Sequence, residues 1–90
     1  MTMTKLLARA LGDWSINVNS IAPGLTETEA VLEMPFQPPG GTLARVNPSK
    51  CFKRTEMPED LVGAAVFLGS DDSDFITGQC LVVDGGMWLR

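Results

Sequence analysis

The stretch Ile-Asn-Val-Asn-Ser-Ile-Ala-Pro-Gly, residues 16–24, decides the fold of this chain. Its first six residues alternate apolar with polar side chains and include β-branched ones, a pattern typical of a strand. Ala22-Pro23-Gly24 then predicts the end of that strand, because proline cannot donate to a ladder and Pro-Gly favours a turn. In open α/β sheets, ligands bind at the carboxyl ends of strands. The sequence therefore predicts a strand over residues 16–21 whose end carries a candidate site.

A helix and a second strand complete the pattern. Met57-Pro58-Glu59-Asp60 predicts a helix start, because proline suits the first helical position and carboxylates complement the positive end of the helix dipole. We expect this helix over residues 58–68. The apolar run over residues 79–83 predicts a strand covered on both faces. Strand, crossover helix and strand in this order indicate two parallel, adjacent strands joined by a right-handed connection, and therefore an α/β fold.

Another helix is predicted near the N-terminus, and both predicted helices carry apolar stripes. The N-terminal helix is expected to pack its stripe on a core and to end at Gly12. No capping residue precedes it, so it resembles an element entered in its middle, and we expect that the chain is truncated. The helix over residues 58–68 is apolar around its circumference, which indicates two buried faces. The stripes comprise Met3, Leu6, Leu7, Ala10 and Leu11 in the N-terminal helix, and Leu61, Ala64, Ala65 and Leu68 with Val62, Val66 and Phe67 in the other.

The remaining segments read as loops and turns. Residues 34–41 hold three prolines and two glycines, which block regular structure, although short helical pieces are expected around residues 29–32 and 43–46. The whole stretch from Thr26 to Thr55 has no sustained period, and a loop this long in a small chain is usually functional or disordered. Asp71, Asp72 and Asp74 lack the glycine and glutamate of an EF-hand, so they predict a solvated capping turn. Asp84 beside Gly85-Gly86 is expected to be a structural turn residue rather than an acid catalyst.

Composition narrows the class of protein. Of the 90 residues, 44% are hydrophobic and 20% charged, with a net charge of −4, which is typical of a globular protein and argues against a nucleic-acid or anionic-membrane surface. No apolar run approaches the length of a membrane span and no secretory signal is visible, so a cytoplasmic location is expected. Cys51 and Cys80 lie in unrelated contexts and the chain has no histidine. We therefore expect reduced, structural thiols and no metal site.

Three segments together resemble the short-chain dehydrogenase/reductase family. They are residues 16–28, Met-Pro-Glu-Asp-Leu-Val-Gly-Ala-Ala-Val-Phe-Leu-Gly-Ser-Asp at 57–71, and Phe-Ile-Thr-Gly-Gln-Cys-Leu-Val-Val-Asp-Gly-Gly at 75–86. The resemblance covers almost the whole chain except the proline-rich loop. It implies the C-terminal part of a Rossmann-like, doubly wound parallel sheet, and NAD or NADP as cofactor of the intact enzyme. It also implies a small-molecule carbonyl or alcohol substrate.

The resemblance also implies site residues. Pro23, Gly24, Thr26 and Thr28 are similar to the turn that receives the nicotinamide end of NAD(P), with the backbone near Thr26 and the hydroxyl of Thr28 as contacts. Many family members have isoleucine or valine in place of Thr26, which bears on the shape of the nicotinamide pocket. The loop over residues 29–56 corresponds to the family's variable substrate loop. Leu25, Met34 and Phe36 are the residues that we expect to line a substrate pocket.

The family's catalytic serine, tyrosine and lysine have no counterpart here. The chain contains no tyrosine, and Lys5 lies about two turns too late to match the lysine, so a solvated helix-face lysine is expected. Neither Gly40-Gly41 nor Gly85-Gly86 forms the phosphate-binding turn that the family places near its N-terminus. We therefore expect no catalytic residues in this chain and no activity from it alone.

Three hypotheses remain open. The chain is a fragment of an NAD(P)-dependent oxidoreductase, an inactive truncated product or interaction module that pairs with an intact relative, or a small unrelated α/β binding module. The order of the three segments favours the first two. The resemblance further implies a homo-oligomer formed through the helix over residues 58–68 and the strand over residues 79–84.

Overall fold

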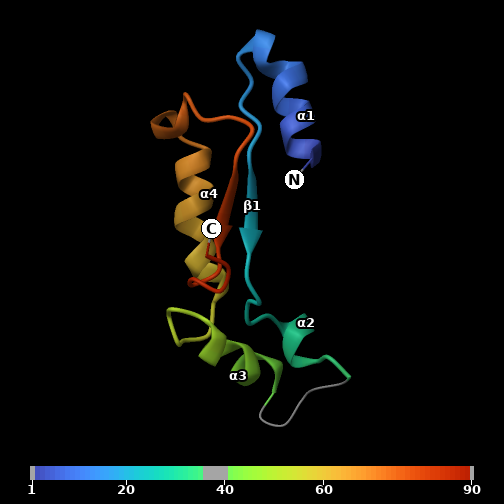
Figure 1. Ribbon diagram of the computed structural model, residues 1–90, viewed down its shortest axis with the longest axis vertical. Coiled ribbons are helices and arrows are strands. Elements are labelled where there is room, and N and C mark those ends of the chain that lie inside the picture. Colours follow the sequence, from blue (N-terminus) through green and yellow to red (C-terminus); the bar gives the residue numbers. More distant parts are fainter. Residues whose placement is uncertain (1, 36–40, 90) are drawn as a thin grey trace. The chain divides into compact units, whose positions relative to one another are not determined.

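The computed structural model describes residues 2–35 and 41–89, which form short helices and one two-stranded parallel sheet (Figure 1). The predicted α/β class and the strand–helix–strand order are confirmed. The elements are α1 (Thr2–Leu11), β1 (Ser20–Pro23), α2 (Glu29–Leu32), α3 (Thr42–Val46), α4 (Val62–Leu68) and β2 (Cys80–Val83), with 3-10 turns at Gly12–Trp14, Asn47–Ser49, Pro58–Leu61 and Asp71–Ser73.

The chain divides into two compact units. The first comprises the chain up to Ala22 together with Val62–Val82, and the second comprises Pro23–Leu61 with the chain from Val83 onward. The first unit thus holds α1, α4 and most of both strands. The second holds the residues at the carboxyl ends of the strands, where the candidate site was predicted.

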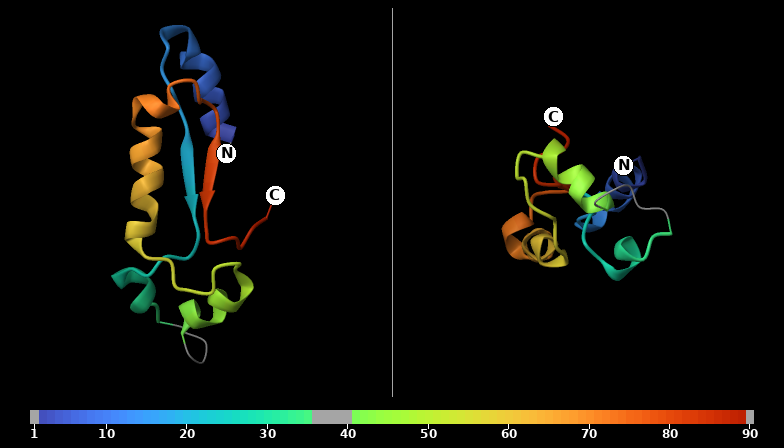
Figure 2. Two further views of the ribbon diagram at one scale, coloured as in Figure 1. Left: turned by 90° about the vertical axis from the view of Figure 1, so that its left-hand side faces the viewer. Right: turned by 90° about the horizontal axis from the view of Figure 1, so that it is seen from below.

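The first unit is layered. β1 and β2 pair in parallel, and α1 and α4 lie on opposite sides of the strand pair (Figure 2). Backbone hydrogen bonds join Ser20 N–H to the Gln79 carbonyl at 2.9 Å and Gly78 N–H to the Val18 carbonyl at 2.8 Å. This arrangement is the helix–sheet–helix layering of an α/β fold.

Strand β1 begins later than predicted. The prediction of a strand over residues 16–21 is wrong for residues 16–19, because β1 spans Ser20–Pro23. Side chains replace the ladder here: Asn17 Nδ2 donates to the Ile76 carbonyl at 2.8 Å, and Asn19 Oδ1 accepts from the Gln79 N–H at 3.1 Å. The prediction that Pro23 stops the strand is also too early, since β1 includes Pro23.

Helix α1 packs a different face from the predicted one. Thr4 and Ala8 are buried, and a Cβ added to Gly78 would lie 3.4 Å from the Ala8 Cβ, which shows close packing on this side. The large side chains Met3, Leu6 and Leu7 are exposed, so the prediction that this stripe packs on a core does not hold in the described structure. Small side chains permit the close approach to Gly78, and the larger ones remain uncovered.

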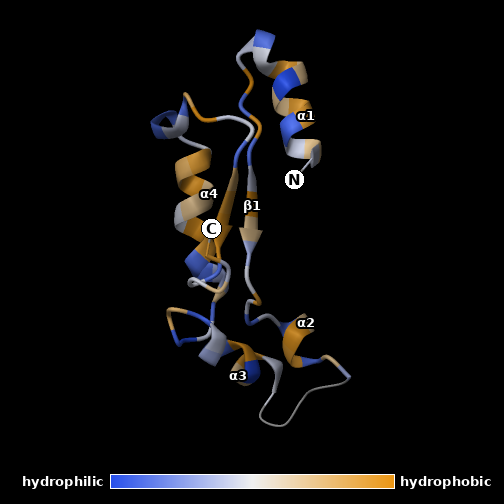
Figure 3. Cartoon of the chain, viewed as in Figure 1, coloured by the Kyte–Doolittle hydropathy of each residue, from blue (hydrophilic) through white to orange (hydrophobic). Residues whose placement is uncertain are grey.

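Helix α4 also keeps an apolar face in solvent. The predicted single helix over residues 58–68 is a 3-10 turn over Pro58–Leu61 followed by α4. Leu61, Ala64 and Leu68 are half-buried, whereas Val66 is 64% exposed; the apolar character of α4 is visible in Figure 3. Across residues 2–35 and 41–89, Ala8 is the one hydrophobic residue that is buried. A chain that is 44% hydrophobic therefore leaves many of its large apolar side chains exposed among the described residues.

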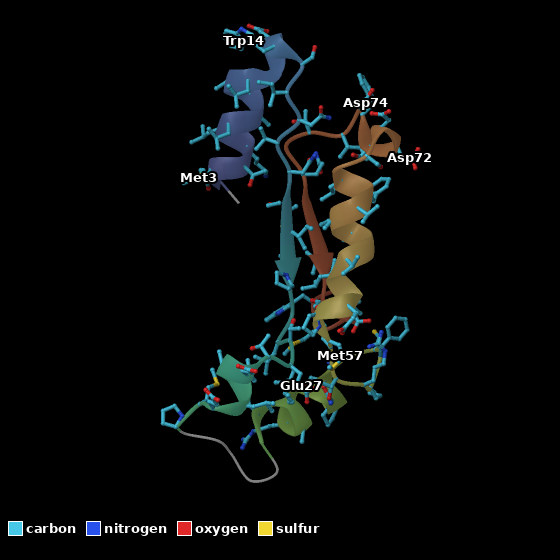
Figure 4. The ribbon with its side chains drawn as sticks, turned by 180° about the vertical axis from the view of Figure 1, so that it is seen from behind. Met3, Trp14, Glu27, Met57, Asp72 and Asp74 are labelled. Carbon is cyan, nitrogen blue, oxygen red and sulfur yellow. The ribbon has the colours of Figure 1, made fainter. Side chains whose placement is uncertain are left out.

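The turn after α4 behaves as predicted for a capping turn. Ser73 is buried, and its hydroxyl donates to the Leu68 carbonyl at 3.0 Å. Asp72 and Asp74 point outward beyond the end of α4 (Figure 4). Cys51 and Cys80 are free thiols, and no helix within the described ranges has the length and apolarity needed to cross a membrane.

Candidate functional site

The second unit contains the turn at residues 23–28, which follows β1 directly. Gly24 N–H donates to the Val83 carbonyl at 3.0 Å, so pairing with β2 continues one residue beyond the strand. Thr26 then forms a parallel bridge with Glu56, and Glu27 N–H donates to the Glu56 carbonyl at 2.8 Å. The turn is therefore anchored on both sides by backbone hydrogen bonds to residues far away in the sequence.

The two threonines of the turn use their hydroxyls differently. Thr26 Oγ1 donates to the Gly24 carbonyl at 3.1 Å, which occupies its hydrogen within the turn itself. Thr28 is the N-cap of α2, and its Oγ1 accepts from the Val31 N–H at 3.3 Å. A hydroxyl that accepts one bond still has its hydrogen and a second lone pair available. Thr28 is exposed, so a ligand can reach this hydroxyl.

Glu56 lies against the turn and was not predicted as a site residue. A Cβ added to Gly24 would lie 2.7 Å from the Glu56 Oε1 atom and 3.0 Å from the Asp84 Cβ, so a side chain at residue 24 would displace the Glu56 carboxyl group and crowd Asp84. Both Glu56 and Asp84 are buried. Nothing near Glu56 in the sequence marks it as buried, because the residues that cover it come from the strand ends.

Asp84 organises the second strand end. Its carboxylate accepts from the Gly86, Met87 and Trp88 N–H groups at 2.9, 3.2 and 3.0 Å. Burial alone would raise the pKa of Asp84, but these three backbone amides outweigh that effect and hold its pKa below the usual value. The prediction of a structural turn residue is confirmed by this geometry.

The structure describes two of the three predicted substrate residues. Leu25 is half-buried within the turn, Met34 is exposed after α2, and Phe36 lies outside the described residues. A separate pocket of about 440 Å³ lies in the second unit, and neither Leu25 nor Met34 lines it. Its wall includes the apolar side chains Val31, Leu32 and Leu43 and the polar side chains Glu27, Asn47 and Thr55. Glu27 lies on the segment between β1 and α2 (Figure 4).

The turn exposes one hydroxyl, that of Thr28, of the kind that a carboxamide or other polar head group can bind. Pro23 and Thr28 are exposed, and the Thr28 hydroxyl keeps hydrogen-bonding capacity toward solvent. The Gly24 and Glu27 amides are already committed to backbone carbonyls. The residues present therefore fit a polar head group at Thr28, and within residues 2–35 and 41–89 no glycine-rich turn joins a strand to a helix.

Known proteins match this chain along nearly all its length. A model of the family described as enoyl-(acyl carrier protein) reductase matches residues 1–88. An uncharacterized oxidoreductase of Mycobacterium tuberculosis is 41% identical over 88 residues, which are 98% of this chain and 34% of that protein.

Solved structures agree with these sequence matches. The 3-oxoacyl-[acyl-carrier protein] reductase of Brucella melitensis superposes with a TM-score of 0.85 at 34% identity, covering 99% of this chain and 32% of that one. A 4-hydroxyisoleucine dehydrogenase complexed with NADH superposes with a TM-score of 0.77 at 32% identity, covering 96% and 33%. The chain thus spans about a third of the length of each of these proteins. With strand order, turn and matches in agreement, the chain belongs to the short-chain dehydrogenase/reductase family.

Proposed function

We propose that this chain forms the nicotinamide side of an NAD(P)-dependent oxidoreductase that acts on a carbonyl or alcohol substrate. The observation that carries the proposal is the turn at residues 23–28, which follows β1, is anchored to Val83 and Glu56, and presents the exposed Thr28 hydroxyl. A solved relative holds NADH, and it and another relative are named for hydroxy and oxo compounds. A cytoplasmic location belongs to the same proposal and agrees with the two free cysteines.

The chain's own part in this function is positioning. When bound, the nicotinamide ring supplies or accepts the hydride. Backbone near Thr26 and the hydroxyl of Thr28 orient the polar end of that ring, and Pro23 and Gly24 set the course of the chain past it. A fixed orientation selects which face of the ring meets the substrate. This chain contributes no proton donor to the reaction, because it has no tyrosine.

The loop over residues 29–56 is proposed to contribute to the substrate pocket. The pocket of about 440 Å³ has a mixed wall, with Val31 and Leu43 on the apolar side and Asn47 bonded to Thr55 at 3.0 Å on the polar side. Such a wall suits a small organic molecule with one polar end. Leu25, Met34 and Phe36 stay as proposed substrate contacts alongside these lining residues.

The apolar surface of the first unit is proposed to be an oligomer interface in the intact protein. A groove of about 230 Å³ is lined by Phe67 and Leu68 of α4 and by Cys80 and Leu81 of β2, which belong to the two segments expected to associate. Val62 and Val66 add exposed apolar area on α4. Contiguous apolar surface of this kind marks interfaces or aggregation sites.

The same exposed surface favours a second candidate function. An inactive module that pairs with an intact relative would need an uncovered apolar face and no catalytic activity, and the chain has exposed apolar side chains and no tyrosine. The two candidates differ at Thr28. An oxidoreductase segment needs its hydroxyl for the cofactor, whereas an interaction module needs only the apolar surface.

Binding of NADH and NADPH by the 90-residue chain tests the proposal. Only part of the pocket is present, so we expect weak binding, with Kd on the order of 1 mM, and chemical-shift changes at the amides of residues 24–28. Thr28→Val should weaken these changes, and Thr2→Val on α1 is the matched control that should not. Shift changes that are absent, or that persist unaltered in Thr28→Val, would favour the interaction module.

A further inference from the structure

Glu56 is a buried acid whose carboxyl group has no hydrogen-bond partner within residues 2–35 and 41–89. The residue is 6% exposed. Asp84 is equally buried at 5%, but its oxygens accept three backbone N–H groups. A buried charge that lacks hydrogen bonds is strongly disfavoured. The fold therefore stabilises the charged form of Asp84 and disfavours the charged form of Glu56.

The charged groups around Glu56 do not reverse this preference. Burial raises the pKa of Glu56, the Gly24 backbone and the Lys50 charge partly offset that rise, and the negative charges of Asp60 and Asp84 add to it. Lys50 Nζ donates to the Arg54 carbonyl at 2.7 Å, and the Arg54 guanidinium binds Asp60. The Gly24 N–H donates to the Val83 carbonyl, and the same backbone group lowers the pKa of Glu56 without outweighing burial. Lys50 and Arg54, the two cations near Glu56, are therefore both bonded to other groups.

Glu56 is joined to the turn through both backbone and side chain. Its backbone bridges Thr26 and accepts from the Glu27 N–H at 2.8 Å. Its Oε1 atom packs over Gly24, at 2.7 Å from the position that a Cβ would take. If the carboxylate moved toward water, it would leave Gly24 uncovered. The movement would also displace the Glu56 backbone, which pairs with the turn.

We propose that Glu56 is a positioning residue for the turn at residues 23–28, which it holds in place only while its carboxyl is uncharged. Ionisation releases the side chain from Gly24, because the ion cannot stay buried without partners, and the bond from Glu27 N–H loosens. The coupling between Glu56 and the turn does not depend on the proposed function. Its consequence for the dinucleotide, a better-ordered turn at lower pH, rests on the proposed function.

The test follows the turn and the acid together in the full chain, without cofactor. Nuclear magnetic resonance records the Glu56 carboxyl carbon and the hydrogen-exchange protection factor of the Glu27 amide across roughly pH 4 to 8. We expect protection to fall as pH rises, in step with the Glu56 titration. The protection factor of the Glu27 amide should fall in proportion to the change in the Glu56 acid dissociation constant when the turn is released. A tenfold change in that constant gives a fall of about tenfold. The Ser20 amide, which bonds to Gln79, is the internal reference.

Variants separate the charge from the shape. Glu56→Gln and Glu56→Met keep the length of the side chain without a titrating group, so the protection of the Glu27 amide should become independent of pH. Glu59→Gln, which alters an exposed acid nearby, should behave as the unaltered chain does. The proposal is overturned if Glu56 titrates at or below its ordinary value, if protection is absent or constant with pH, or if both Glu56 variants keep the pH dependence. Failure of NADH binding alone would overturn only the proposed function.

Discussion

The Arg54 guanidinium holds the Asp60 carboxylate through two hydrogen bonds of 2.8 Å each. The same carboxylate accepts from the Met57 N–H at 2.8 Å, at the start of the 3-10 turn that leads into α4. Two parallel bonds between a guanidinium and a carboxylate have a defined geometry, unlike most surface ion pairs. The Arg54 side chain and the Met57 amide together hold the pKa of Asp60 well below its ordinary value.

This pair predicts a pH-dependent stability. Because the pKa of Asp60 is lower in the folded chain than its ordinary 3.8, the stabilisation is present above that value and is lost as pH falls below it. Asp60→Asn should lower the urea midpoint at neutral pH, and the difference from the unaltered chain should shrink in acid. Midpoints measured at one chain concentration check this. Asp72→Asn is the control, and an equal effect from it would contradict the assignment.

Gly86 should tolerate no side chain. Its φ is 85°, and an added Cβ would lie 2.7 Å from both the Cβ and Sγ atoms of Cys51. We expect Gly86→Ala to cost about 2–4 kcal/mol from the left-handed backbone and the clash. Hydrogen exchange at the Phe52 amide, which bonds to the Gly85 carbonyl, reports the loss locally. Gly12→Ala, where a Cβ meets nothing within 4 Å, should be neutral; comparable costs for both variants would refute this explanation.

The exposed apolar faces predict association of the isolated chain. Leu6 and Val66 are each 64% exposed, on helices that lie on opposite sides of the sheet. Sedimentation should therefore show oligomers, aggregates or a partly folded chain. Val66→Lys should reduce association, whereas Glu33→Gln, which changes the net charge equally at an exposed site, should not. A compact monomer at micromolar concentration with a sharp melt would contradict the expectation.

The isolated chain is also expected to lack dehydrogenase and reductase activity. General acid–base catalysis needs a positioned proton donor, and the chain has no tyrosine to serve as the family's donor. Spectrophotometric assays with NADH and NADPH should show no turnover above that of Thr28→Ala. Turnover that the Thr28 substitution reduces would mean that another residue of this chain donates the proton.

Local sequence patterns predicted the elements well. The short helical piece expected at residues 29–32 is α2, and the apolar run at residues 79–83 contains β2. The predicted start of β1 failed because Asn17 and Asn19 bond to residues 73–79, a pairing that alternation along the chain does not reveal. Tertiary contacts overrode the local pattern at that point.

The candidate site was predicted only in part. Pro23 and Gly24 indicate a turn, because the Pro-Gly pair favours one. The resemblance to the family pointed to Thr26 and Thr28. Glu56 carries no such local signal, since its burial depends on Gly24 and Asp84 at the ends of two strands. Periodicity likewise could not predict that the apolar stripes are exposed. It identifies the apolar face of a helix but not whether another element covers that face.

The central claim is that this chain supplies the nicotinamide side of an oxidoreductase, and a chimera tests it most directly. The matching third of the Brucella melitensis 3-oxoacyl-[acyl-carrier protein] reductase is replaced by this chain, and NAD(P)H oxidation with a 3-oxoacyl substrate is measured. We expect turnover that Thr28→Val lowers about tenfold, the effect of losing one hydrogen bond, while Thr2→Val leaves it unchanged. A chimera that folds but binds neither NADH nor NADPH would contradict the claim.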